Sequence, residues 1–93
     1  MWEVRILKSI NKSIEKLPIK IQNSFFVFAE ELQQLGPYRN NWLNYGVLKG
    51  KKNIYHCHIK KGKPTYVVIW EVKDKKIKIM EVIYVGTHEK AKY

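Results

Sequence analysis

The chain has 93 residues, 45% of them hydrophobic and 13% aromatic, which is enough for one globular core and too little for two, so residues 1–93 are expected to form a single domain. Eighteen lysines and arginines against eight acidic residues give a formal net charge of +10, which indicates an anionic partner. The lone Cys57 excludes an internal disulfide, and the absence of any apolar run longer than about five residues argues against a signal sequence or a membrane span.

The first half of the chain predicts one strand followed by two helices. Residues 2–7 alternate apolar and charged side chains, which is the period of a half-buried strand. Ser9 is a candidate cap for a short helix that runs to about residue 16 and is ended by Pro18. A longer helix follows, with apolar residues at helical spacing and a stop at Gly36. Phe25, Phe28 and Leu32 are predicted to be core rather than a binding surface, because the sheet must bury one face. The positions on the apolar stripe are Ile21, Phe25, Phe28, Ala29, Leu32 and Leu35.

The second half predicts a sheet. Residues 38–45 are polar and aromatic and are expected to form a loop anchored by Trp42, and residues 47–49 are a candidate short strand. Three longer strands follow, separated by turns rich in lysine, glycine and proline. They are predicted at residues 53–60, 65–73 and 77–85, with Gly86 releasing the chain into a polar tail.

This order of elements predicts an α+β fold. Both helices are expected to pack on one face of a twisted, mainly antiparallel sheet of four to five strands. The last two strands are apolar on nearly both faces, as in central strands that are covered on both sides, or covered on one and occupied on the other. The face opposite the helices is then available to a ligand.

The three histidines all lie in the second half of the chain. Residues i and i+2 of a strand project from the same face, so His56, His58 and Lys60 are predicted to share one surface while Cys57 faces the core. Imidazole takes and gives protons near neutral pH, which makes this surface a candidate catalytic site. With His88, the pair also matches the three imidazole ligands of a catalytic zinc, and this alternative stays open. The carboxylates that would support such ligands are few: Glu71, Glu81 and Glu89.

The histidine half is also the basic half. Residues 1–46 hold six basic and four acidic side chains, whereas residues 47–93 hold twelve and four. Clustered lysines attract polyphosphate through counterion release, so nucleic acid is favoured over a small acidic metabolite. The alternative for the loop lysines is a surface that is merely solvated. These lysines are Lys51, Lys52, Lys61 and Lys63. The use of a single cysteine fits a reducing cytoplasm.

Five short motifs occur along the chain in a distinctive order and spacing. They are residues 16–18 (KLP), 44–50 (NYGVLKG), 55–60 (YHCHIK), 70–72 (WEV) and 84–89 (YVGTHE). They resemble the RelE/ParE superfamily of toxins from toxin-antitoxin systems, nearest to its RelE and HigB branches, and the resemblance extends over nearly the whole chain. The resemblance implies a RelE-like fold.

The resemblance also implies an activity, that of an mRNA interferase. Such an enzyme is a ribosome-dependent endoribonuclease that enters the A site, cuts translated mRNA without a metal or other cofactor, inhibits translation and is held inactive by a cognate antitoxin. The family places basic residues on the strand that corresponds to residues 54–60, another after the last strand and an aromatic residue near the C-terminus. In RelE itself the basic residues are lysines and an arginine, so histidine here is a departure toward HigB-like chemistry. The matching positions hold His56, His58, His88 and Tyr93.

Metal-independent cleavage of RNA requires a base for the 2′-hydroxyl, a cation for the charge on the phosphorane and an acid for the 5′-oxygen. We expect His58 or His56 to act as base, His88 as acid, and Lys60 with Lys61 to stabilise the phosphate charge. Tyr93 is expected to stack on or orient a nucleotide. A further family arginine aligns with Val67, so its role is vacant or is met by Lys60, Lys61 or Lys63. The candidate RNA and phosphate ligands are Lys51, Lys52, Lys60, Lys61 and Lys63.

Two other functions remain open. One is a ParE-like inhibitor of DNA gyrase that acts by binding, which a strand face lacking histidine and lysine would have favoured. The other is a catalytically degenerate toxin homologue that only binds nucleic acid. In the leading case an antitoxin encoded by an adjacent gene is the expected partner, along with mRNA and the ribosome.

Overall fold

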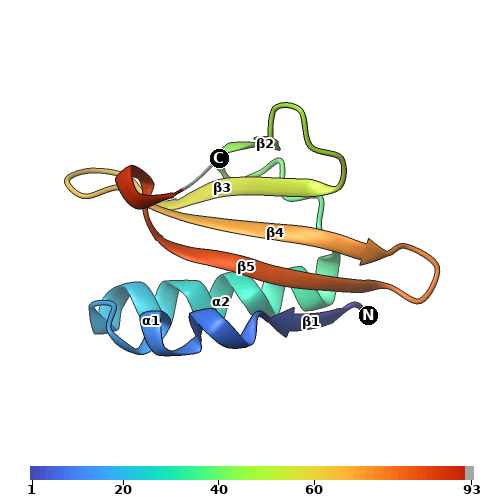
Figure 1. The fold of residues 1–93 in the computed structure, drawn as a ribbon, viewed down its shortest axis with the longest axis horizontal. Helices are drawn as coiled ribbons and strands as arrows, with labels where there is room; N and C mark the ends of the chain where they lie inside the picture. The colour runs from blue at the N-terminus through green and yellow to red at the C-terminus, as the bar shows by residue number, and fades with distance from the viewer. Residues whose placement is uncertain (92–93) are drawn as a thin grey trace.

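A computed structural model of the chain describes residues 1–91 and shows a helical layer on a single sheet (Figure 1). The elements are β1 (Glu3–Ile6), the 3₁₀ turn η1 (Lys8–Ile10), α1 (Asn11–Glu15), α2 (Ile19–Leu35), β2 (Leu43–Val47), β3 (Ile54–Lys60), β4 (Tyr66–Asp74), β5 (Ile79–Thr87) and the 3₁₀ turn η2 (His88–Lys90). The strand order is β1-β5-β4-β3-β2, with β1 parallel to β5 and every other pair antiparallel. The predicted α+β architecture is therefore confirmed.

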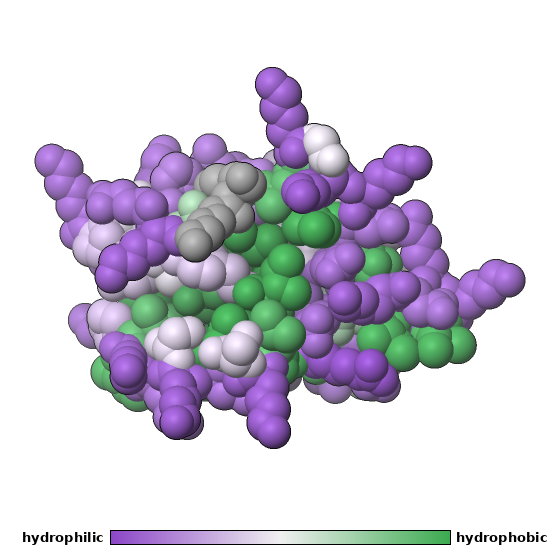
Figure 2. All heavy atoms as spheres, viewed as in Figure 1, coloured by the Kyte–Doolittle hydropathy of each residue, from purple (hydrophilic) through white to green (hydrophobic). Residues whose placement is uncertain are grey.

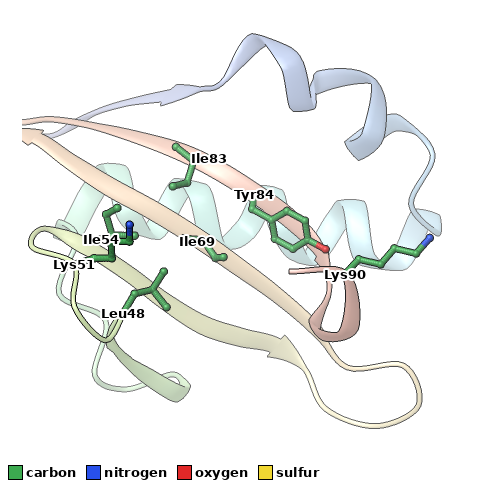
Figure 3. Close-up of a pocket in the computed structure, with 7 residues that line it drawn as sticks. All are labelled: Leu48, Lys51, Ile54, Ile69, Ile83, Tyr84 and Lys90. Carbon is green, nitrogen blue, oxygen red and sulfur yellow. The ribbon is translucent and has the colours of Figure 1, made fainter. Parts of the chain in front are cut away.

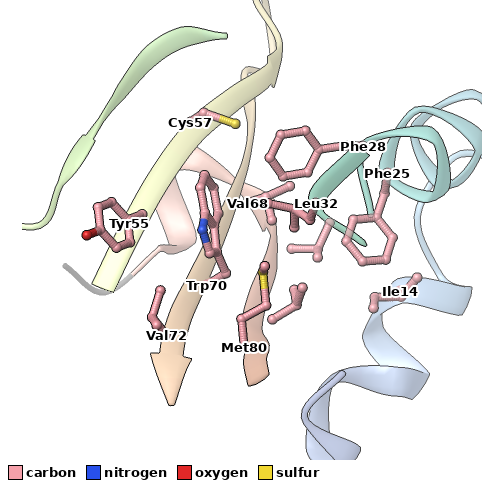
Figure 4. Packing of buried hydrophobic residues seen from close by; sticks show 12 residues of the cluster. Ile14, Phe25, Phe28, Leu32, Tyr55, Cys57, Val68, Trp70, Val72 and Met80 are labelled. Atoms are coloured by element: carbon pink, nitrogen blue, oxygen red, sulfur yellow. The ribbon is translucent and has the colours of Figure 1, made fainter. Parts of the chain in front are cut away.

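The core lies between α2 and one face of the sheet (Figure 4). Phe25, Phe28 and Leu32 of α2 are fully buried, and Trp70 of β4 meets Phe28 edge to face with ring centroids 5.3 Å apart. Burying side chains of this size stabilises a fold by roughly 1.5–3 kcal/mol each. The predicted core positions Phe25, Phe28 and Leu32 are thus confirmed, whereas Leu35, at the last position of the helix, is 66% exposed.

The segment before α2 differs from the predicted single capped helix. Ser9 lies inside η1 and makes no capping hydrogen bond to either short helix. Instead Ser13 donates its hydroxyl to the Ile10 carbonyl, 2.7 Å away, and Ile14 supplies the buried contact of α1. The helical prediction is correct for the region but wrong about its start, because a tight 3₁₀ turn replaces the capped first turn.

The connection after α2 becomes a strand earlier than predicted. The sequence favours a loop to residue 45 and a strand at residues 47–49, whereas β2 spans Leu43–Val47. Asn44 has a φ of 54°, and the pairing with β3 shifts register between Leu43 and Gly46. This bulge removes the alternation by which a strand is recognised in a sequence. The predicted anchor is confirmed, because the Trp42 indole donates to the Glu31 carboxylate at 2.6 Å.

The last strand starts and ends two residues later than predicted. The Asp74 carboxylate accepts backbone N–H groups from Lys76 and Ile77, which holds a longer turn between β4 and β5. Strand β5 then continues through Gly86, which the sequence had suggested as the end of the strand. No helix within residues 1–91 is long and apolar enough to cross a bilayer.

Candidate active site

Strand β3 carries two of the histidines on the face of the sheet opposite α2. Its burial alternates, with Tyr55 and Cys57 buried in the core and His56 and His58 half-buried. The alternation confirms that Cys57 faces the core, where burial raises the pKa of its thiol to about 12. The thiol therefore stays protonated at neutral pH and has no part in the site.

His56 occupies a space that its neighbour in β2 leaves open. The strands pair His56 with Gly46 on one side and with Ile69 of β4 on the other. A Cβ atom built on Gly46 would lie 3.8 Å from His56 Nε2. The imidazole thus lies over the glycine backbone, on the same face as His58.

The third histidine meets the pair at the end of β5. His88 opens η2, and its ring packs edge-on against His58 with ring centroids 5.5 Å apart. The backbone N–H of His88 donates to the Thr65 carbonyl at 2.9 Å, which joins η2 to the start of β4. The structure therefore brings His88 to the pair of histidines that strand geometry already predicts on one face.

The electrostatics of the site favour the neutral form of the two β3 histidines. Burial lowers the pKa of His56, and the neighbouring His58 and His88 lower it further. Burial also lowers the pKa of His58, with contributions from His88 and from the Lys61 ammonium. Both β3 histidines are consequently unprotonated at neutral pH, which is the form that accepts a proton.

A pocket of about 480 Å³ opens beside the His58–His88 pair. One wall is the hairpin between β3 and β4, which Thr65 stabilises by donating its hydroxyl to the Gly62 carbonyl at 2.8 Å. The pocket combines imidazole, ammonium, hydroxyl and carboxylate groups within one concavity. Its lining consists of His58, Gly62, Lys63, Pro64, Thr65, Thr87, His88 and Glu89.

The predicted lysines do not all lie at this pocket. Lys63 lines it and Lys61 is close enough to affect His58. Lys60 is exposed beyond a β-bulge between His58 and Lys60, so the simple alternation that placed it on the histidine face no longer applies. Lys52 is exposed in the turn before β3, and Lys51 lines a different pocket.

One further predicted position, Val67, has a clear outcome. Val67 is fully buried, paired with His58 on one side and Gly86 on the other, so β4 supplies no cation where the family arginine aligns. Of the lysines suggested for that role, Lys61 has the closest electrostatic link to His58. Tyr93 lies outside the described residues.

The three carboxylates considered as supports of a metal site or as bases lie in two different places on the molecule. Glu71 and Glu81 both face Lys73, at 3.0 Å and 3.7 Å from its Nζ, near the far end of the sheet. Glu89 lines the histidine pocket. Within residues 1–91, no group of three or more His, Cys, Asp and Glu side chains has the arrangement of a metal site.

A second pocket, of about 470 Å³, extends along the same sheet face (Figure 3). Its floor is apolar, and Lys51 and Lys90 lie at opposite ends of it. The sequence signal for this pocket was the apolar character of both faces of β4 and β5. In Figure 2 hydrophobic side chains gather in the middle of the molecule with long hydrophilic ones around them. The apolar lining consists of Leu48, Ile54, Ile69, Ile83 and Tyr84.

Comparison with known proteins gives matches in structure only. No protein-family model matches the sequence, and no curated protein is similar to it in sequence. The structure is similar to RelE in the archaeal RelE-RelB complex from Pyrococcus horikoshii OT3, with a TM-score of 0.74 and 22% identity over 97% of this chain and 98% of that chain. It is also similar to the isolated E. coli RelE toxin, with a TM-score of 0.73 and 18% identity over 99% of this chain and 89% of the other. For the intact E. coli RelBE toxin-antitoxin complex the TM-score is 0.71, with 20% identity over all of both chains. The chain therefore has the fold of the RelE toxins.

Proposed function

We propose that the chain is the toxin of a toxin-antitoxin system and acts as an mRNA interferase, a ribosome-dependent endoribonuclease that inhibits translation in the cytoplasm. The observation that carries the proposal is the His58–His88 ring contact beside His56, on the lysine-bordered open face of a RelE fold. Fold similarity alone does not specify an activity, so the argument depends on this cluster.

The cluster supplies the groups that metal-independent RNA cleavage needs. His58 or His56, neutral at physiological pH, takes the proton of the 2′-hydroxyl. The 2′-oxygen attacks the phosphorus, and His88 gives a proton to the 5′-oxygen as it leaves. Lys61 and Lys63 stabilise the charge on the phosphorane, and Tyr93 orients a nucleotide. General acid-base assistance of this kind contributes roughly 100-fold to 10,000-fold in rate.

The proposed substrate is mRNA in the ribosomal A site. The net charge of +10 suits a surface surrounded by phosphate. The pocket beside His58 and His88 is open to solvent and bordered by Lys63, so a single RNA strand can reach the imidazoles.

We also propose that a cognate antitoxin holds the protein inactive, because an unrestrained interferase would stop growth. The two complexes that match the fold each pair RelE with RelB. The antitoxin is expected to be acidic and to be encoded by an adjacent small reading frame. Co-expression of the two followed by affinity purification tests this, with formation of a stable complex and loss of toxicity as the expected result.

The activity is tested with purified protein and ribosomes stalled on a defined mRNA. Primer extension is expected to show cuts within the A-site codon, and attack by the 2′-oxygen leaves a 2′,3′-cyclic phosphate and a 5′-hydroxyl. A 2′-deoxy nucleotide at the cut position should abolish cleavage. Intact mRNA together with inhibited gyrase supercoiling would instead identify a ParE-like inhibitor, and 3′-hydroxyl ends would contradict the proposed chemistry.

A further inference from the structure

The junction between β5 and η2 holds a tyrosine that none of the roles above uses. Tyr84 donates its hydroxyl to the Thr87 carbonyl at 2.7 Å. Thr87 is the last residue of β5 and directly precedes His88, the first residue of η2. The hydrogen bond therefore fixes the backbone unit from which the His88 side chain departs. Figure 3 shows the Tyr84 ring with its hydroxyl directed toward the turn that carries Lys90.

Gly86 provides the space that this hydrogen bond requires. Tyr84 and Gly86 are two residues apart in a strand and so share a face. A Cβ atom on Gly86 would lie 2.6 Å from the Tyr84 hydroxyl and 2.9 Å from the carbon that bears it. The backbone of Gly86 does not adopt a positive φ. The glycine is thus needed because the phenol occupies the place of a side chain, not because of an unusual backbone conformation.

His88 has two backbone supports, one on each side. Its own N–H donates to the Thr65 carbonyl at 2.9 Å, and the preceding carbonyl, that of Thr87, accepts the Tyr84 hydroxyl at 2.7 Å. The imidazole packs edge-on against His58. The two backbone hydrogen bonds therefore fix the point on the chain from which the His88 ring reaches His58.

We propose that Tyr84, with the space provided by Gly86, is a positioning residue that holds His88 against His58 for proton transfer to the leaving oxygen. The inference rests on the proposed function and specifies which residues assemble its site. Burial raises the pKa of the Tyr84 phenol more than the bond to Thr87 lowers it, so the hydroxyl remains a donor at neutral pH. Tyr84 acts through His88 and does not touch the reacting atoms.

The test compares Tyr84→Phe and Gly86→Ala with the wild type, and uses Tyr45→Phe as the matched control because Tyr45 packs on the core side of the sheet. Cleavage on stalled ribosomes should fall on the order of 10-fold to 100-fold in kcat for Tyr84→Phe with KM unchanged, since misplacement of a catalytic group by about 1 Å costs up to that much. Tyr45→Phe should cut at the wild-type rate. The double variant Tyr84→Phe/Gly86→Ala should be no slower than the slower single variant, because both changes break the same bond.

NMR of the imidazole protons gives a readout that does not depend on cleavage. In Tyr84→Phe the His58–His88 proximity should be lost and the pKa of His58 should rise toward its ordinary value, because the His88 charge moves away. Wild-type kcat together with an unchanged His58–His88 contact would overturn the proposal. If the wild type itself fails to cut mRNA, the proposed function fails, and the NMR contact alone then decides whether Tyr84 positions His88.

Discussion

The lowered pKa values of His56 and His58 lead to a pH dependence of stability, besides suiting the base role proposed for them. Each has a pKa lowered by burial and by neighbouring positive charge. The folded state therefore binds protons less readily than the unfolded chain, in which histidine titrates near about 6.5. Above that pH both histidines are neutral in the folded and the unfolded state, and the free energy of unfolding keeps its full value. As the pH falls below about 6.5, the unfolded state binds protons first, so the free energy of unfolding decreases.

We predict that the free energy of unfolding decreases between about pH 7.5 and pH 5.5. Urea denaturation followed by tryptophan fluorescence measures it across this range. A His56→Gln/His58→Gln variant should show a much flatter dependence, because the two groups that titrate there are removed. The prediction is contradicted if the wild type gains stability on acidification.

At the scale of elements, a single carboxylate joins the β2 connection to α2. Glu31 of α2 accepts hydrogen bonds from the Trp42 indole at 2.6 Å, Arg39 at 3.0 Å and Asn41 at 3.4 Å. Burial would raise the pKa of Glu31, but these hydrogen bonds and the Arg39 charge outweigh burial and lower it. The carboxylate thus stabilises the fold while it is ionised, and that contribution is lost as the pH falls through its lowered pKa.

We predict that Glu31→Ala lowers the free energy of unfolding by roughly 1–3 kcal/mol, the range for hydrogen bonds to a charged group. Thermal and urea denaturation at pH 7 measure the loss. Glu30→Ala, at the next position of α2 but exposed, is the matched control and should change stability little. Equal losses in the two variants would show that the connection is not held through Glu31.

The elements also differ in how well the sequence predicts them, for physical reasons. Helix α2 has local signals at both ends, Pro18 before it and Gly36 after it, and its apolar stripe identifies the buried face. Strand β2 has none, because the positive φ of Asn44 and a register shift interrupt its alternation. Local periodicity predicts an element only where the pairing is regular.

The same limit applies to the site. The shared face of His56 and His58 follows from strand geometry alone. The approach of His88 depends on the register of β5 against β4 and on the turn at Thr87, which no local pattern encodes. The family resemblance supplied that expectation. The positioning role proposed for Tyr84 depends on a hydrogen bond to the Thr87 carbonyl that no sequence pattern predicts.

At the scale of the whole molecule, the charge of +10 should make RNA binding strongly dependent on salt. For single strands the logarithm of the affinity falls with the logarithm of the salt concentration by about 0.7 per phosphate contact. We predict that Lys61→Gln and Lys63→Gln each reduce this slope by about that amount, measured by fluorescence anisotropy with a short RNA. Lys75→Gln, in the turn at the other end of β4, is the control and should leave the slope unchanged (Figure 1). A flat salt response of the wild type would argue against an RNA partner.

The central claim is that the three clustered histidines cut mRNA, and single-turnover cleavage on stalled ribosomes tests it most directly. His58→Ala and His88→Ala are each expected to lower the cutting rate by roughly 100-fold to 10,000-fold while their thermal unfolding stays close to that of the wild type. His56→Ala should also slow cleavage, and comparison with His58→Ala identifies the base. Wild-type cutting rates in all three variants would contradict the account.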